Sequence, residues 1–117
     1  EKGTGTWCPY CPGAAMGFKD MENAGHNVTL ISYHSGDNYT TAESSARIAY
    51  YDMGGFPTTV FDGGHDITGG SATQSSFPGF KAVYDETIEV PSLVSMNMQI
   101  KQIDNKYTAT ISLEQHS

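Results

Sequence analysis

The sequence has few cysteines, few basic residues and no long apolar run, and each scarcity excludes a class of protein. Two cysteines cannot build the multi-disulfide framework of a small secreted scaffold. Six basic residues against 13 acidic ones give a formal net charge of -7, which argues against a nucleic-acid partner. No apolar run approaches the length that crosses a membrane, so we predict no membrane insertion.

What is present fits one globular unit. The 117 residues include seven tyrosines and five phenylalanines, enough apolar surface to argue against disorder. A chain of this length can build one modest core but not two. We therefore predict an α/β domain over residues 1–90 and a β-hairpin tail over residues 91–117.

Hydrophobic periodicity predicts the elements of the α/β domain. In chain order they are a helix over 9–24, a strand over 28–33, a helix over 41–53, short strands over 58–62 and 66–68, and a helix over 78–89. Thr40 and Glu43 have capping-box spacing at the start of the second helix. Small residues at positions 13, 14, 15 and 17 either let the first helix approach a sheet closely or simply weaken it.

The tail has a different pattern, in which apolar and polar residues alternate on both sides of Asp104-Asn105. This alternation predicts an antiparallel hairpin with one apolar face. An isolated hairpin is marginally stable in water, so two arrangements are expected. Either the hairpin packs on the domain or exchanges with a second copy, or it opens a further β-domain that this sequence truncates.

Cys8 and Cys11 are the only cysteines, and they stand three positions apart at the start of the first predicted helix. A helix beginning at Pro9 would make Cys8 its N-cap, where free amides and the helix dipole stabilise a thiolate. Cys11 would follow one turn later, within reach of a disulfide. Pro12 lacks an amide hydrogen and is expected to loosen or kink this turn.

Three roles are open to the cysteine pair: a metal site, a structural disulfide or a redox couple. A structural zinc site normally needs four ligands, and beyond the cysteines only scattered histidines remain: His26, His34, His65 and His116. A purely structural disulfide over three positions closes a tiny loop and gains little entropy. The spacing at a helix start favours a redox couple, and neither a metal nor a cofactor is predicted.

Two stretches resemble the thioredoxin-fold active site. Trp7-Cys8-Pro9-Tyr10-Cys11 has a thioredoxin-like Trp-Cys start and the Cys-Pro-Tyr-Cys motif of glutaredoxins, and Gly55 to Phe61 (GFPTTVF) resembles the family's cis-proline loop. The resemblance implies that Cys8 and Cys11 are catalytic. It also implies a substrate-binding role for four neighbours: Trp7, Tyr10, Phe56 and Pro57.

More narrowly, GTWCPYCP, the His34-Ser35-Gly36-Asp37 stretch and the β-tail resemble the outer-membrane-protein-related thioredoxin-like family of bacterial secreted or surface proteins. This resemblance implies an extracytoplasmic location, in the periplasm, at the cell surface or secreted. In the thioredoxin fold a central strand precedes the CxxC motif, yet only residues 1–6 precede Trp7 here. Most of that strand is therefore expected to be missing, its place taken by upstream chain, another copy or the tail.

We accordingly predict a thiol–disulfide oxidoreductase acting on protein or small-molecule disulfides, with protein thiols or glutathione-like thiols as partners. The alternative is a non-catalytic adhesion or scaffold module that uses the hairpin as its interaction surface, for example in a homodimer. His34 is interpreted as a solvated strand-end residue or as a substrate or proton-transfer group. Asp37 is interpreted as a turn residue.

Overall fold

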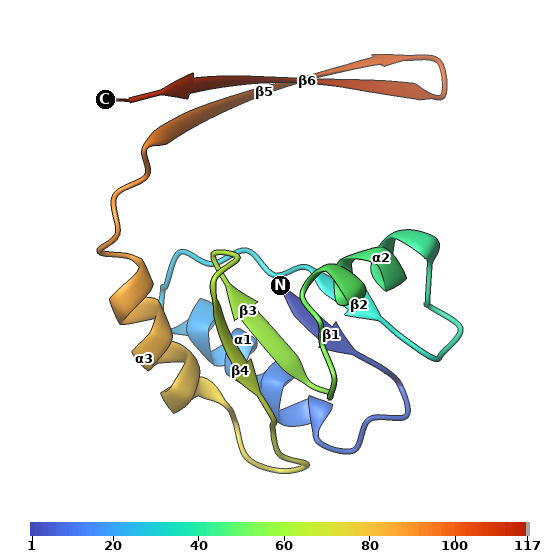
Figure 1. The fold of residues 1–117 in the computed structure, drawn as a ribbon, viewed down its shortest axis with the longest axis vertical. Coiled ribbons are helices and arrows are strands. Elements are labelled where there is room, and N and C mark those ends of the chain that lie inside the picture. The colour runs from blue at the N-terminus through green and yellow to red at the C-terminus, as the bar shows by residue number, and fades with distance from the viewer. Residues whose placement is uncertain (117) are drawn as a thin grey trace.

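A computed structural model describes residues 1–116, which form a mixed four-stranded sheet with three helices and a separate hairpin (Figure 1). The elements are β1 (Lys2–Thr4), α1 (Cys11–Asn23), β2 (Ser32–His34), α2 (Ala42–Tyr50), β3 (Thr58–Phe61), β4 (His65–Thr68), α3 (Phe77–Thr87), β5 (Val94–Ile103) and β6 (Lys106–Gln115). The α/β architecture with a C-terminal hairpin is thus confirmed. None of the described helices combines the length and apolarity needed to cross a membrane.

The strand before the cysteines is short but present. β1 lies inside the sheet, whose order is β2-β1-β3-β4. It pairs in parallel with β2, where Gly3 faces Tyr33, and antiparallel with β3, where Gly3 faces Thr58. Three residues therefore occupy the central position that the sequence led us to expect largely empty, and the tail does not fill it.

The second strand is shorter than the sequence predicts. The prediction covered 28–33, whereas β2 spans only Ser32–His34. β1 begins at Lys2, whose amide donates to the Ile31 carbonyl at 2.9 Å, and the register then runs forward from Ser32. Residues 28–30 have no neighbour in β1, so their β-forming side chains cannot produce a strand without a partner.

The first helix begins two residues later than predicted, which changes the position of Cys8. The N-cap is Tyr10 and the helix starts at Cys11, so Cys8 is not the N-cap. This start places Pro12 in the first turn, where a missing amide hydrogen breaks no helical bond. The expectation that Pro12 loosens or kinks the turn assumed a helix from Pro9, whereas in the helix that starts at Cys11 this proline removes no helical hydrogen bond.

Two of the small residues of α1, Gly13 and Gly17, allow close packing against α3 and its preceding loop. An added Cβ at Gly17 would lie 2.9 Å from the Phe80 ring of α3, and one at Gly13 would lie 2.6 Å from the Ser71 carbonyl oxygen. The apolar face of α1 meets β3 and α3 in the main core cluster, formed by Ala14, Phe18, Met21, Phe61 and Phe80. This core fixes the helix that carries Cys11.

A capping box starts α2 one residue later than predicted. The Thr41 hydroxyl accepts from the Ser44 amide at 3.0 Å, and the Ser44 hydroxyl accepts from the Thr41 amide at 2.9 Å. Thr40 and Glu43 are therefore not the capping pair. Ser44 also donates to the His34 carbonyl at 2.8 Å, which ties the start of α2 to the end of β2.

The tail forms the predicted hairpin, with Asp104 and Asn105 at its turn. The register places Met98 opposite Ile111 on one face and Gln99 opposite Thr110 on the other, so one face is apolar and the other polar. The hairpin lies apart from the α/β layers in Figure 1, and every residue of β5 and β6 is exposed. Of the expected arrangements, packing on the domain does not occur.

Candidate active site

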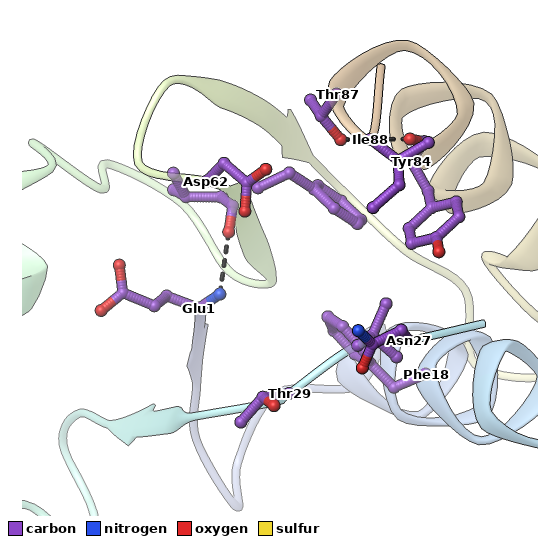
Figure 2. A pocket seen from close by; sticks show the side chains of 11 residues that line it. Glu1, Phe18, Asn27, Thr29, Asp62, Tyr84, Thr87 and Ile88 are labelled. Atoms are coloured by element: carbon purple, nitrogen blue, oxygen red, sulfur yellow. Dashed lines mark hydrogen bonds between the residues drawn. The ribbon is translucent and has the colours of Figure 1, made fainter. Parts of the chain in front are cut away.

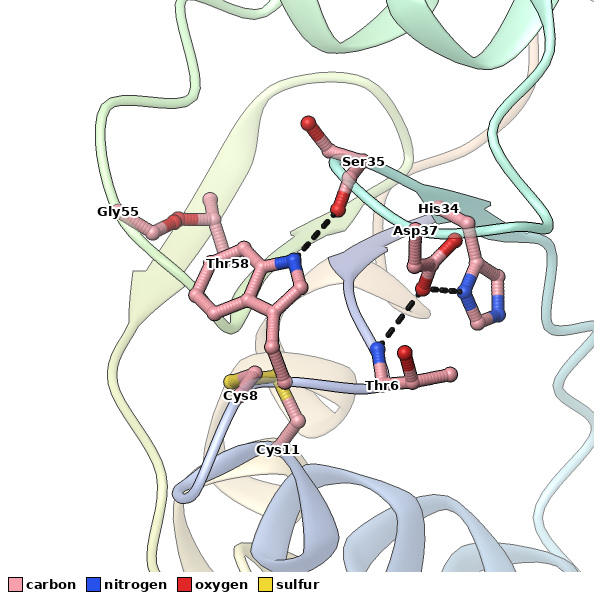
Figure 3. The surroundings of a disulfide bond; sticks show 9 residues. Thr6, Cys8, Cys11, His34, Ser35, Asp37, Gly55 and Thr58 are labelled. Carbon is pink, nitrogen blue, oxygen red and sulfur yellow. Dashed lines mark hydrogen bonds and ion pairs between the residues drawn. A yellow bond between two sulfur atoms is a disulfide. The ribbon is translucent and has the colours of Figure 1, made fainter.

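Cys8 and Cys11 form a disulfide at the end of β1 where the chain enters α1 (Figure 3). Their Cα atoms are 5.5 Å apart. Because Cys11 is the first residue of α1, the sulfur atoms remain at the positive end of the helix dipole, although Cys8 itself precedes the helix. The sequence-predicted cysteine pair is thus brought together, in its oxidised form.

The loop before β3 packs against the cysteine segment. The Phe56–Pro57 peptide bond is cis, and Pro57 is fully buried. A Cβ added at Gly70 would lie 2.4 Å from the Tyr10 carbonyl oxygen and 2.9 Å from Pro57 Cγ. Tyr10, which lies between the two cysteines in the chain, and Pro57 therefore both pack against Gly70, where there is no room for a side chain.

The side chain of Trp7, next to Cys8, is held by one hydrogen bond and one ring contact. Its indole nitrogen donates to the Ser35 carbonyl at 2.7 Å, and its ring meets the Phe56 ring edge-on with 5.7 Å between centroids. Gly5 and Gly36 leave space for the indole, since a Cβ at either would lie 2.5 and 3.1 Å from its nitrogen. The outer part of the indole remains open, and Trp7 is 53% exposed.

The structure therefore gathers all six predicted site residues in one region, with unequal access. Tyr10 is 57% exposed and, with Trp7, offers an aromatic surface beside the disulfide. Cys8 and Cys11 are each only 6% exposed, and Pro57 is fully buried. The two aromatic side chains are therefore much more accessible from solvent than the sulfur atoms.

A residue interpreted as a simple turn former organises the loop beside this site. The Asp37 carboxylate accepts from the Thr6 amide at 2.8 Å, and His34 Nδ1 lies 2.7 Å from the same oxygen (Figure 3). The His34 contact, followed by the amides of Thr6 and Tyr39, lowers the pKa of Asp37 to about 2. His34 is half-buried against this carboxylate and is not the solvated strand-end residue considered above.

A hollow lies at the opposite end of β1 from the cysteines (Figure 2). It has a volume of about 310 Å³ and opens between Phe18 of α1, Thr29, Asp62 at the end of β3, and Tyr84 of α3. It contains no cysteine or histidine. Within residues 1–116 no group of three or more histidine, cysteine, aspartate or glutamate side chains is placed to hold a metal ion.

Comparison with family models, with curated proteins and with solved structures found no match to this chain.

Proposed function

We propose that the chain is a thiol–disulfide oxidoreductase whose redox couple is Cys8 and Cys11. The observation that carries the proposal is the pairing of these two residues in a disulfide at the first turn of α1, packed against the Pro57 loop. A dithiol pair at a helix start is the arrangement in which thiolates are stabilised and exchange is fast.

In the reductive direction, the Cys8 thiolate attacks one sulfur of a substrate disulfide. A Cys8–substrate disulfide forms, the substrate disulfide breaks, and the departing thiolate takes up a proton. The Cys11 thiolate then attacks Cys8 sulfur, which re-forms the internal disulfide and releases the second substrate thiol. Two electrons pass from the dithiol to the substrate, and the reverse sequence oxidises a substrate dithiol.

The proposal extends to the fold family and the location. The strand order, the position of the cysteines between β1 and α1, and the proline directly before β3 support a thioredoxin-like fold. Trp7, Tyr10 and Phe56 would form the substrate-facing surface, with Pro57 supporting it from below. An extracytoplasmic location, with protein or glutathione-like thiols as partners, follows only from the resemblance of the sequence motifs.

A glutathione redox titration tests the proposal directly. The oxidised fraction of the Cys8–Cys11 pair is followed by mass after acid quenching and by Trp7 fluorescence. A catalytic couple gives a reversible two-electron transition between about -120 and -280 mV. A bond that stays oxidised below about -300 mV would be a structural disulfide and would contradict the proposal.

Single cysteine variants then assign the roles. Cys11→Ala keeps the attacking thiol but removes the resolving one, so we expect it to accumulate mixed disulfides with a model substrate. Cys8→Ala is the matched control and should accumulate none. Turnover that survives in Cys8→Ala would exclude the assigned nucleophile.

A second candidate function has its own support in the hairpin. All of β5 and β6 is exposed, including the apolar face, and the cysteines are buried. Exposed apolar faces of this kind mark interaction sites, which favours the alternative of a scaffold or adhesion module. In this proposal two copies of the chain pair through their hairpins.

The two faces of the hairpin provide the test. Met98→Lys combined with Ile111→Lys charges a cross-strand pair on the apolar face, whereas Gln99→Lys charges the polar face and serves as control. Sedimentation should show a dimer for the unmodified chain and the control, and a monomer for the double variant. Sedimentation of the unmodified chain as a monomer would exclude the homodimer formed through the hairpins.

A further inference from the structure

Asp37 divides its carboxylate between two tasks. One oxygen accepts from the Tyr39 amide at 2.9 Å and from the Thr40 hydroxyl at 3.4 Å, which folds the loop around itself. The other oxygen accepts from the Thr6 amide at 2.8 Å and lies 2.7 Å from His34 Nδ1. The Asp37 side chain is itself only 5% exposed, with these four groups around its two oxygens.

The same loop also holds the next residue of the cysteine segment. The Ser35 carbonyl accepts from the Trp7 indole, and Gly36 adopts a positive φ of 69° directly against that ring. A side chain at Gly36 would be strained by this φ and would crowd the indole. Thr6 and Trp7 are therefore both attached to the loop after β2, one by its backbone and one by its side chain.

These attachments bear on Cys8 because the segment is short and turned. The Cys8 amide donates to the Gly5 carbonyl at 3.0 Å, so residues 5–8 form one tight unit. Cys8 follows Trp7 directly and is almost completely buried. Release of Thr6 and Trp7 would therefore move Cys8 as well and uncover its sulfur.

We propose that Asp37 is a positioning residue of the redox site, which holds the Thr6–Trp7 segment closed and thereby limits how fast the Cys8–Cys11 disulfide can be reached. This inference rests on the proposed redox function and adds to it a residue outside the CxxC motif. Asp37 touches neither the substrate nor the sulfur atoms and acts through Thr6 and Trp7.

The conservative variant Asp37→Asn separates the two tasks of the carboxylate. An amide whose oxygen faces Tyr39 and Thr40 preserves the internal bonds of the loop, and its NH₂ group can donate to His34 Nδ1. The Thr6 amide then faces a donor instead of an acceptor, so its bond is lost. Asp37→Ala removes both tasks, and Asp66→Asn, on exposed β4, controls for the lost charge.

The test measures the second-order rate constant for reduction of the disulfide by dithiothreitol in native buffer. Each event converts one internal disulfide to two thiols and one dithiothreitol to its cyclic disulfide. Loss of a charge-assisted hydrogen bond corresponds to about tenfold in an opening equilibrium, so we expect about tenfold faster reduction in Asp37→Asn and Asp37→Ala. Asp66→Asn should stay within about twofold of the unmodified chain, which is the spread expected for surface substitutions.

Trp7 emission, measured together with far-UV circular dichroism, distinguishes release of the indole from general destabilisation. In Asp37→Asn the emission should shift to the red while far-UV circular dichroism stays unchanged, because the indole becomes more exposed to water while the protein remains folded. Should Asp37→Ala fail to fold, Asp37→Asn still decides the outcome. A reduction rate in Asp37→Asn within about twofold of the unmodified chain would overturn the inference.

The outcomes for Asp37 and for the redox function are separable. Equal reduction rates together with a reversible glutathione titration would refute the role of Asp37 and leave the oxidoreductase standing. Faster reduction in Asp37→Asn together with a bond that never exchanges with glutathione would support the positioning role and refute the oxidoreductase.

Discussion

Substitution of Gly13 by alanine is the sharpest test of how the cysteine helix is held. Gly13 lies in the first turn of α1, two residues after Cys11. Its amide donates to the Ser71 carbonyl at 2.7 Å, and its carbonyl accepts from the Ser76 amide at 3.0 Å. The helix start is thus bonded on both sides to the loop that precedes α3.

Two opposing effects determine how much Gly13→Ala changes the free energy of unfolding. Alanine is favoured over glycine inside a helix by roughly 0.5–1 kcal/mol. However, the new Cβ would lie 2.6 Å from the carbonyl oxygens of Ser71 and Gln74, which belong to backbone and cannot rotate away. Overpacking of this kind costs about 1–3 kcal/mol. Because backbone crowds the site from two residues, we expect the upper part of that range and a net loss of about 2 kcal/mol.

Gly79→Ala in α3 is the matched control. There the added Cβ would meet only Ile67 Cδ1, at 3.9 Å, which is an ordinary contact. This variant should be as stable as the unmodified chain or more stable by a few tenths of a kcal/mol. The same substitution is therefore expected to lower the free energy of unfolding at Gly13 and to leave it unchanged or raise it slightly at Gly79.

Urea unfolding followed by Trp7 fluorescence and circular dichroism measures both variants. For a small domain with an m-value near 1 kcal/mol/M, Gly13→Ala should lower the midpoint by about 2 M. A urea midpoint of Gly13→Ala equal to or above that of the unmodified chain would show that the loop before α3 is not packed closely against α1. The close packing described for the cysteine helix would then be wrong.

Three further predictions concern the core, a cap and an ion pair. Phe80→Ala removes a fully buried ring that contacts Phe18 and should cost about 3–5 kcal/mol in urea unfolding. Thr41→Ala removes the N-cap of α2 and should cost about 1 kcal/mol in the same assay. Arg47, hydrogen-bonded to Glu1, lowers the pKa of that carboxyl to about 2 from its ordinary 4.5. The resulting stability is present above pH 4.5 and is lost as the pH falls toward 2, so the midpoints of Arg47→Met and the unmodified chain should converge over that interval.

The sequence predicted the elements whose signal is local. The alternation on both sides of Asp104-Asn105 was sufficient for the hairpin, and the apolar spacing of Ala14, Phe18 and Met21 was sufficient for α1. Both signals depend only on residues within one element. The sequence also indicated which residues would lie together around the cysteines, because the CxxC motif and the proline loop are short and distinctive.

What could not be predicted depends on residues far apart in the chain. Val28 and Leu30 favour a strand, but a strand forms only where β1 supplies a partner, and that register is not written in either segment. Asp37 and Thr6 are separated by 31 positions, so only the folded chain brings the carboxylate to the cysteine segment. The burial of Cys8 is likewise a property of several loops together. Thr40 and Thr41 are equally good caps in the sequence, and the bond from Ser44 to the end of β2 accompanies the choice of Thr41.

The central position of β1 has a consequence for biosynthesis. During synthesis Lys2–Thr4 leave the ribosome before the two strands that flank them, because β2 and β3 emerge about 30 and about 55 residues later. Cys8 and Cys11 therefore spend that interval in an unfolded nascent segment, accessible to any oxidant or thiol in their compartment. The pair can therefore meet an oxidant before the sheet closes around β1.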